Sequence, residues 1–193
     1  MMALPAEKPR YTYADVLTWD ESERVELIDG EVFMMAPAPA RVHQSISMEL
    51  SRQIANYLRG KKCKVFPAPF DVRLFEEDGD FPEDMDTVVE PDITVVCDPS
   101  KLDERGCKGA PDMVVEILSP STQRHDRFTK FSLYQRAGVR EYWIVDPNNK
   151  TAQSFILEDG RYSVKEFGTV GDTMKVNVLE DCVIDLSEVF SEE

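Results

Sequence analysis

Apolar residues recur along the chain with two periods, and the switches between these periods predict the order of the elements. One stripe recurs every four positions, at Val42, Ile46, Leu50, Ile54 and Leu58. This spacing places the five side chains on one face of a helix of about four turns, which Gly60 ends. A second helix is expected at residues 123–137, before Gly138, and a short one at residues 12–18.

Continuous or alternating apolar runs predict strands at residues 64–75, 92–97, 113–118 and 140–146. Asp29-Gly30 joins two apolar runs within RVELIDGEVFMMAP, which is a strong hairpin signal, and AQSFILEDGRYSVKEF predicts a second hairpin after Thr151. The expected fold class is therefore α/β, with helices flanking one mixed β-sheet and a β-hairpin towards each end of the chain. We expect a single domain spanning residues 1–193.

The length of 193 residues suits one substantial core and is short for two domains. No apolar run approaches the roughly 18 residues of a membrane span, and the start, MMALPAEKPR, lacks the apolar core of a signal peptide. We therefore expect a soluble, cytoplasmic protein that does not engage a membrane. Cys63, Cys97, Cys107 and Cys182 lack zinc-ligand spacing, which favours reduced packing thiols over a disulfide or a zinc site.

The 22 Lys and Arg residues against 37 Asp and Glu residues leave a net charge of −15. Such acidity repels polyphosphate and counts against nucleic-acid binding. The charge is unevenly distributed, however, because residues 76–92 are dense in carboxylates whereas residues 123–140 carry five Lys and Arg against one Asp. The acidic run lacks EF-hand spacing and is typical of a solvated loop, and residues 123–140 are expected to form a local basic face.

The stretch PDMVVEILSPST, residues 111–122, has the form of a metallonuclease motif without its lysine. A Pro-Asp pair precedes an apolar strand that carries Glu116, but Leu118 stands where lysine would be expected. Asp112 and Glu116 share one face of the strand and lie roughly 13 Å apart, at about 3.3 Å per residue. Because magnesium ligands lie about 2.1 Å from the ion, Asp112 is a poor partner for Glu116.

A better partner for Glu116 is Asp92, which opens the apolar strand of EPDITVV. If this strand pairs beside the strand of Glu116, the two carboxylates converge at one edge of the sheet. A divalent ion held there would polarise a phosphoryl oxygen and lower the pKa of a bound water. The missing cation is expected from the next helix, where three polar residues recur every four positions: Asp126, Lys130 and Tyr134.

Most of these residues also have an ordinary structural interpretation. Asp126 and Lys130 would form a surface ion pair of little energetic value, and Asp92 would be an aspartate at a strand start. Tyr134 is most simply a packing residue. Glu116 differs from them, because a lone carboxylate inside VVEIL is costly to bury without a partner.

Several segments occur in the same order as in a known family: VELIDGEVFMMAPAPARVHQ, EPDITVV, APDMVVEILSPST and DRFTKFSLYQRAGVREYWIVDP. Over nearly its whole length the chain resembles the Uma-two family of restriction-endonuclease-like proteins. The resemblance implies the PD-(D/E)XK nuclease fold, a central mixed sheet flanked by helices. It also implies that Asp92 and Glu116 are metal ligands, that the Ile117 backbone carbonyl is a third, and that Lys130 replaces the lysine missing at Leu118.

The same resemblance brings in two further residues. Glu26 would be the additional acidic residue that many superfamily members supply from an early element, and His43 would contact metal-bound water or phosphate. The alternative for Glu26 is a salt-bridged hairpin position. The alternative for His43 is a hydrogen-bonding residue at a helix start.

These observations predict a Mg²⁺- or Mn²⁺-dependent endonuclease that hydrolyses phosphodiester bonds in DNA. The expected catalytic residues are Asp92, Glu116, Lys130, Glu26 and His43. Two alternatives stay open: a non-catalytic interaction or regulatory module, which the acidity favours, and a hydrolase of small phosphorylated metabolites. A homodimer is also expected, because superfamily nucleases often dimerise to cut two strands and the C-terminal hairpin offers an apolar surface.

Overall fold

The computed structural model describes residues 9–20, 24–35, 40–120 and 122–191. The helices are α1 (Tyr13–Val16), α2 (Arg41–Leu58), α3 (Phe131–Ala137) and α4 (Leu186–Val189), with 3-10 turns η1 (Pro82–Asp84) and η2 (Pro99–Lys101) and a π-helix, η3 (His125–Lys130). Among the residues described, no helix has both the length and the apolar character needed to cross a bilayer.

The strands form two larger sheets and a small pair. The N-terminal sheet contains β1 (Val25–Ile28), β2 (Glu31–Met34), β4 (Val72–Arg73), β5 (Val88–Val89), β7 (Leu102–Asp103) and β8 (Gly106–Lys108). The central sheet contains β3 (Lys64–Pro67), β6 (Ile93–Val96), β9 (Met113–Ile117), β10 (Glu141–Asp146), β11 (Thr151–Glu158) and β12 (Arg161–Thr169). The pair is β13 (Thr173–Lys175) with β14 (Val183–Asp185).

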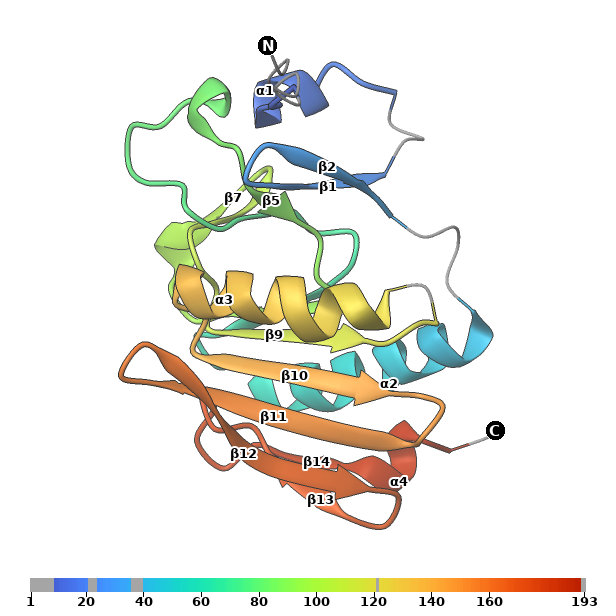
Figure 1. Cartoon of the computed structure of the whole chain (residues 1–193). Coiled ribbons are helices and arrows are strands. Elements are labelled where there is room, and N and C mark those ends of the chain that lie inside the picture. Colours follow the sequence, from blue (N-terminus) through green and yellow to red (C-terminus); the bar gives the residue numbers. More distant parts are fainter. Residues whose placement is uncertain (1–8, 21–23, 36–39, 121, 192–193) are drawn as a thin grey trace.

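The central sheet has the order β12-β11-β10-β9-β6-β3 and is mixed. β9 and β10 are parallel, because the connection through η3 and α3 returns the chain in the same direction, and the other neighbours are antiparallel. Figure 1 shows α3 in front of β9, with the N-terminal sheet above and the C-terminal strands below. The predicted α/β class, a mixed sheet flanked by helices, is confirmed.

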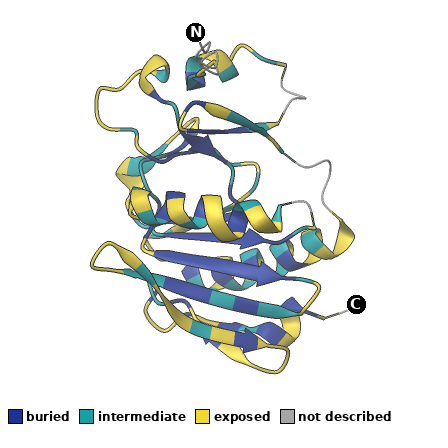
Figure 2. Ribbon diagram, viewed as in Figure 1, coloured by how far each residue is buried: buried dark blue, intermediate teal, exposed yellow. Residues whose placement is uncertain are grey.

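Alternation along β9 divides its side chains between two cores. Met113, Val115 and Ile117 pack with the buried stripe of α2, whereas Val114 and Leu118 pack with residues of α3. Helix α2 therefore covers one face of the central sheet and α3 covers the other. Figure 2 shows β9 and β10 buried along their length. The side chain of Glu116 lies on the face of the central sheet that α3 covers, so its contacts come from that side of the sheet.

Both predicted hairpins are present. Asp29 and Gly30 connect β1 to β2 with φ angles of 50° and 74°, and Asp159 and Gly160 connect β11 to β12 with φ angles of 51° and 76°. Two successive positive φ angles match the right-handed twist of a hairpin, and glycine adopts them without the steric cost of a Cβ atom.

The prediction of one sheet was incomplete, because the N-terminal sheet was not foreseen. Residues 64–75, expected as one strand, are divided between β3 in the central sheet and β4 in the N-terminal sheet. Pro67 and Pro69 interrupt the run, since proline has no N–H to donate to a ladder. Strands β5, β7 and β8 have two or three residues each, too few for a period to be recognised.

The expectation of reduced cysteines is wrong for two of the four. Cys63 and Cys97 form a disulfide, while Cys107 and Cys182 are free and buried. Lys64 pairs with Val96 in the antiparallel β3–β6 ladder, so the next position outward brings the two linked cysteines opposite each other. Their spacing in the sequence does not reveal this pairing.

Replacing Leu50 by alanine tests the packing of α2. Leu50 is fully buried in the core between α2 and the central sheet, so Leu50→Ala should lower the free energy of unfolding by about 2 to 5 kcal/mol. Met48, 72% exposed on the same helix, is the control, and Met48→Ala should change this free energy by less than about 0.5 kcal/mol. Urea unfolding followed by circular dichroism measures both, and equal decreases would contradict the placement of the helix.

Candidate active site

Asp92 and Glu116 lie side by side at the ends of two neighbouring strands. Ile93 pairs with Val115 in the β6–β9 ladder, so the next position outward places Asp92 opposite Glu116. Residues opposed in this way have Cβ atoms about 4.5 to 5.5 Å apart. The backbone N–H of Ile117 donates to Asp92 Oδ2 at 2.7 Å and fixes that carboxylate at the strand end.

Lys130 reaches the same place from η3. Its Nζ lies 2.8 Å from Glu26 Oε1 and 2.9 Å from Glu116 Oε1, with Asp126 Oδ1 at 4.0 Å, and all four residues are buried. Burial alone would lower the pKa of Lys130, but the three carboxylates outweigh it and raise this pKa well above its ordinary value. Lys130 is therefore an ammonium that balances part of a buried negative cluster.

Tyr134, interpreted from the sequence as a packing residue, also contacts the site. Its hydroxyl donates to Glu116 Oε1 at 2.6 Å, so one carboxylate oxygen accepts hydrogen bonds from both Tyr134 and Lys130. The two donors together fix the orientation of Glu116. The polar stripe at steps of four residues was the signal that could have identified Tyr134.

Asp126 and Lys130, two residues of the polar stripe, lie in an unusual helical segment. η3 is a π-helix of six residues that leads directly into α3. Such i→i+5 turns are rare and often occur at functional sites. Asp126 and Lys130 are 2% and 4% exposed, so their interpretation as a surface ion pair is wrong. Lys130 is bonded to carboxylates from β1 and β9 instead.

His43 approaches Asp92 from the first turn of α2. Its Nε2 lies 3.3 Å from Asp92 Oδ2. Burial lowers the pKa of His43, but Asp92 and the backbone of Ile117 outweigh this effect and raise it. The other ring nitrogen, Nδ1, is buried without a hydrogen-bond partner in the part of the chain described. A protonated ring here would have a donor available for an anionic ligand.

His125, at the start of η3, was not considered as a site residue from the sequence. Its Nε2 lies 4.0 Å from Glu26 Oε2 and is buried without a hydrogen-bond partner among the residues described. The ring packs against Phe33, with centroids 4.8 Å apart. Burial and the nearby Lys130 lower the pKa of His125, which favours a neutral ring beside the acidic cluster.

The carboxylates outnumber the cations that face them. Burial raises the pKa of Glu116 well above its ordinary value, and Lys130 opposes that shift. The neighbouring carboxylates of Asp126, Asp92 and Glu26 raise it further. Burial likewise raises the pKa of Asp126 to about 6, again against Lys130. A divalent cation at this cluster would relieve the repulsion between its carboxylates.

The donor atoms fit a hard divalent cation. Mg²⁺ and Mn²⁺ prefer carboxylate and carbonyl oxygens, which Asp92, Glu116 and the Ile117 backbone can supply. Within residues 9–20, 24–35, 40–120 and 122–191, no three His, Cys, Asp or Glu side chains are arranged as a metal-binding group. A cation here would therefore depend on two carboxylates, a backbone oxygen and water.

The basic face expected at residues 123–140 is largely neutralised by ion pairs. These pairs are Arg127 with Asp146, Arg136 with Asp29, and Arg140 with Asp112. Asp112 also accepts a hydrogen bond from the Cys97 backbone N–H at 2.7 Å. Asp112, the aspartate of the second Pro-Asp pair, therefore hydrogen-bonds the chain at the end of β6 and is not a partner of Glu116.

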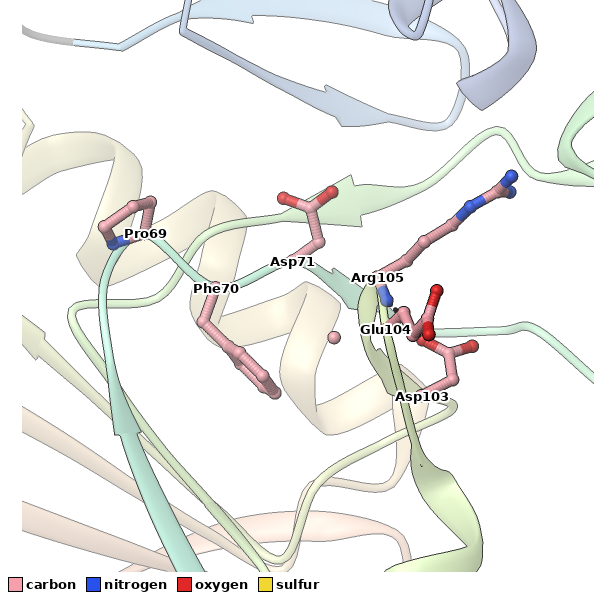
Figure 3. A pocket seen from close by; sticks show the side chains of 7 residues that line it. Pro69, Phe70, Asp71, Asp103, Glu104 and Arg105 are labelled. Carbon is pink, nitrogen blue, oxygen red and sulfur yellow. Dashed lines mark hydrogen bonds between the residues drawn. The ribbon is translucent and has the colours of Figure 1, made fainter.

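A surface pocket of about 270 Å³ lies beside β4 and the β7–β8 turn, away from this cluster (Figure 3). Its lining residues are Pro69, Phe70, Asp71, Asp103, Glu104, Arg105 and Gly106. Asp71 accepts from the Tyr13 hydroxyl and Asp103 accepts from Arg73, both at 2.6 Å. None of the predicted site residues lines this pocket.

A mixed sheet flanked by helices, with two acidic residues at adjoining strand ends, is the arrangement of a restriction-endonuclease-like protein. The family model for Uma2, described as "Putative restriction endonuclease", matches residues 13–187. The chain belongs to the Uma2 family. Its family and fold therefore place it among nuclease-like proteins.

Relatives and a solved structure agree with this assignment. A Synechocystis sp. (strain ATCC 27184 / PCC 6803 / Kazusa) protein, "Uncharacterized protein slr1290", is 30% identical over 140 residues, covering 71% of this chain and 69% of that protein. A second protein of that strain, "Uncharacterized protein sll1609", is 25% identical over 140 residues, covering 70% and 74%.

The chain is also similar to a crystal structure from Anabaena variabilis ATCC 29413, described as a putative nuclease belonging to DUF820. The TM-score is 0.70 with 19% sequence identity, over 93% of this chain and 97% of the other. At this identity the likeness is one of fold.

The buried Asp126 predicts a pH dependence of stability. Its pKa of about 6 in the folded protein exceeds the ordinary value near 3.9, so the folded state binds this proton more tightly than the unfolded chain does. Its contribution to stability is complete below about pH 4 and disappears as the pH rises through about 6. The total decrease is roughly 3 kcal/mol, at about 1.4 kcal/mol per unit of pKa.

The variant Asp126→Asn removes this titration. Urea unfolding of both proteins between about pH 4.5 and about pH 7 should show the variant gaining stability relative to the wild type as the pH rises. A difference that stays constant over this range would contradict the raised pKa.

Proposed function

We propose that this chain is a metal-dependent endonuclease that hydrolyses phosphodiester bonds in DNA. The observation that supports this most is the meeting of Asp92 and Glu116 at the β6–β9 strand ends, with the Lys130 ammonium 2.9 Å from Glu116. Phosphodiester hydrolysis needs carboxylates to hold a divalent ion and a cation to stabilise developing negative charge. Membership of the Uma2 family supports the same reaction class.

In this proposal Asp92, Glu116 and the Ile117 backbone carbonyl hold Mg²⁺ or Mn²⁺. When bound, the ion supplies Lewis-acid polarisation of a phosphoryl oxygen and lowers the pKa of water at the site. The excess of buried carboxylates over cations is the feature of the chain that favours such an ion.

The side chains around the ligands have separate roles in the proposed reaction. Lys130 stabilises the charge that develops on the phosphoryl oxygens as water bonds to phosphorus and the bond to the leaving oxygen breaks. Tyr134 orients Glu116, and Glu26, 2.8 Å from Lys130, positions the ammonium. His43, whose pKa is raised beside Asp92, provides a donor for the phosphate group.

The second candidate function is a non-catalytic interaction or regulatory module that retains the nuclease fold. The bonds from Lys130 to Glu26 and Glu116 favour it, because buried ion clusters can be retained for conformational specificity. The net charge of −15 favours it as well. The two candidates differ in whether changes at Glu116 abolish a reaction or alter stability alone.

We also propose that the chain is one domain and that it forms a homodimer. Val72 and Val89 of the N-terminal sheet share a hydrophobic cluster with Val114 of the central sheet, which joins the two sheets in one core. The exposed Val164 and Phe167 of β12 offer apolar area to a second copy, and two copies could act on two strands. Sedimentation velocity tests the dimer, and a monomer at all concentrations would exclude it.

Metal-dependent cleavage of a panel of DNA and RNA substrates tests the proposed reaction. Wild type should cleave at low salt with Mg²⁺ or Mn²⁺, and Glu116→Gln, Asp92→Asn and Lys130→Met should each reduce the rate by about 100-fold or more, because each removes a charge that acts on the transition state. Asp112→Asn is the matched control, since this residue also follows a proline but lies away from Glu116, and it should retain activity.

Circular dichroism and calorimetric titration with Mn²⁺ complete the test. The inactive variants should remain folded at the assay temperature, although Lys130→Met should lower the free energy of unfolding because it leaves Glu26 and Glu116 without their cation. Mn²⁺ binding should depend on Glu116 and not on Asp112. Wild type that neither cleaves any substrate nor binds metal through Glu116 would exclude catalysis and leave the non-catalytic module.

A further inference from the structure

Helix α2 and the loop after it are positively charged in an otherwise acidic chain. Residues 41–64, RVHQSISMELSRQIANYLRGKKCK, contain six Lys and Arg residues and one carboxylate, Glu49. The whole chain has 37 acidic residues against 22 basic ones. The charge balance of this segment is therefore the reverse of that of the whole chain.

Five of the six cations are exposed and form no ion pair within the described part of the chain. Four of them, Arg41, Arg59, Lys61 and Lys62, lie on or beside α2, and we call these the α2 ridge. The fifth, Lys64, pairs with Val96 in the β3–β6 ladder and shares with it the face of the central sheet that α3 covers. The sixth, Arg52, pairs with Glu49 and Glu188 at 2.6 and 2.5 Å. Lys61 lies over the Tyr57 ring, 3.1 Å from its centroid, and is still exposed to solvent. The ridge thus differs from residues 123–140, where ion pairs neutralise most of the cations.

The ridge begins at the candidate active site. Arg41 is the first residue of α2, and His43 in the same turn lies 3.3 Å from Asp92. The first turn contains no acidic residue, although the helix dipole favours anions and disfavours cations at this end. The dipole would favour one or two cations after Leu58, but it accounts neither for Arg41 nor for the three cations Arg59, Lys61 and Lys62 at the other end.

The outward face of α2 connects the two ends of the ridge. Its exposed positions follow one another at steps of three or four residues: Arg41, Ser45, Met48, Arg52, Asn56 and Arg59. The helix has 18 residues and spans about 27 Å, which matches about eight nucleotides at 3.4 Å per phosphate. The side chains between the cations are short, polar or flexible, so an extended ligand can approach the helix closely.

We propose that the α2 ridge binds the sugar-phosphate backbone of nucleic acid and leads it to the Asp92–Glu116 site. This inference rests on the proposed nuclease function and adds the path of the substrate, with about eight nucleotides on one side of the scissile bond lying along α2. Cations at both ends of a helix about 27 Å long fit an extended polyanion better than a compact ligand. Repulsion by the acidic remainder of the surface restricts the backbone to this ridge.

Salt-dependent binding of a labelled duplex of about 30 base pairs in EDTA tests the path, because EDTA prevents cleavage while the ionic interactions with phosphate persist. The ridge variant combines Arg59→Gln, Lys61→Gln and Lys62→Gln. The control variant combines Arg161→Gln, Lys165→Gln and Lys175→Gln, three exposed cations of the C-terminal strands. Both variants change the net charge equally, so a general charge effect is matched.

The ridge variant should bind at least about tenfold more weakly at low salt. The slope of log affinity against log salt should become shallower by about one for each phosphate that the protein no longer neutralises. The control variant should keep the slope of the wild type. Equal weakening in both variants would overturn the proposal, as would a wild type that does not bind the duplex at low salt.

Hydrolysis of bis-p-nitrophenyl phosphate separates this inference from the proposed function. The small diester is too short to reach from Asp92 to Lys61, so the ridge variant should hydrolyse it at the wild-type rate while Glu116→Gln does not. If hydrolysis depends on Glu116 but duplex binding does not depend on the ridge, the proposed nuclease function stands and the path along α2 is overturned. Ridge-dependent binding without any hydrolysis would retain the path and overturn the nuclease.

Discussion

The Lys130 ammonium between Glu26 and Glu116 is the interaction on which the rest of the site depends. It joins three elements, because Glu26 belongs to β1, Glu116 to β9 and Lys130 to η3. Each charge would be costly to bury alone, by several kcal/mol, so the three are stable only as a group with further hydrogen bonds. Tyr134 supplies one of these to Glu116, and the Glu90 backbone N–H supplies another to Glu26 at 3.0 Å. The N-terminal sheet, the central sheet and the π-helix are thus held together by electrostatic interactions as well as by apolar packing.

The same group explains how the cluster obtains a cation without a lysine two residues after Glu116. Leu118 is 4% exposed and belongs to the hydrophobic cluster under α3, where a lysine would need a charged partner. The cation comes instead from the helix that follows β9, and the π-helical turn directs both Asp126 and Lys130 inward. The absence of one motif residue is therefore compensated by the next element along the chain.

Net charge describes this protein poorly, because its charges are segregated. Carboxylates gather in the buried cluster and in the run at residues 76–92, while most cations of residues 123–140 are held in ion pairs. Within residues 41–64, Arg41, Arg59, Lys61 and Lys62 are exposed and form no ion pair in the described part of the chain, and they lie on or beside one helix. A strongly acidic chain can therefore retain a positive surface beside its candidate active site, and the local arrangement decides what can approach it.

Local pattern by itself determined the principal helices, both hairpins, the strands of Asp92 and Glu116 and the side each residue faces, because these follow from periods within one segment. It also singled out Asp92, Glu116 and Lys130 as candidates. Only the tertiary structure decided the N-terminal sheet, the Cys63–Cys97 disulfide, the hydroxyl of Tyr134 on Glu116 and the partners of the basic residues. These depend on contacts between segments far apart in the chain, and their short strands and single side chains carry no periodic signal. Burial, too, is set by packing between elements, which is why Lys130 is a buried ion and not the surface residue that its spacing alone allowed.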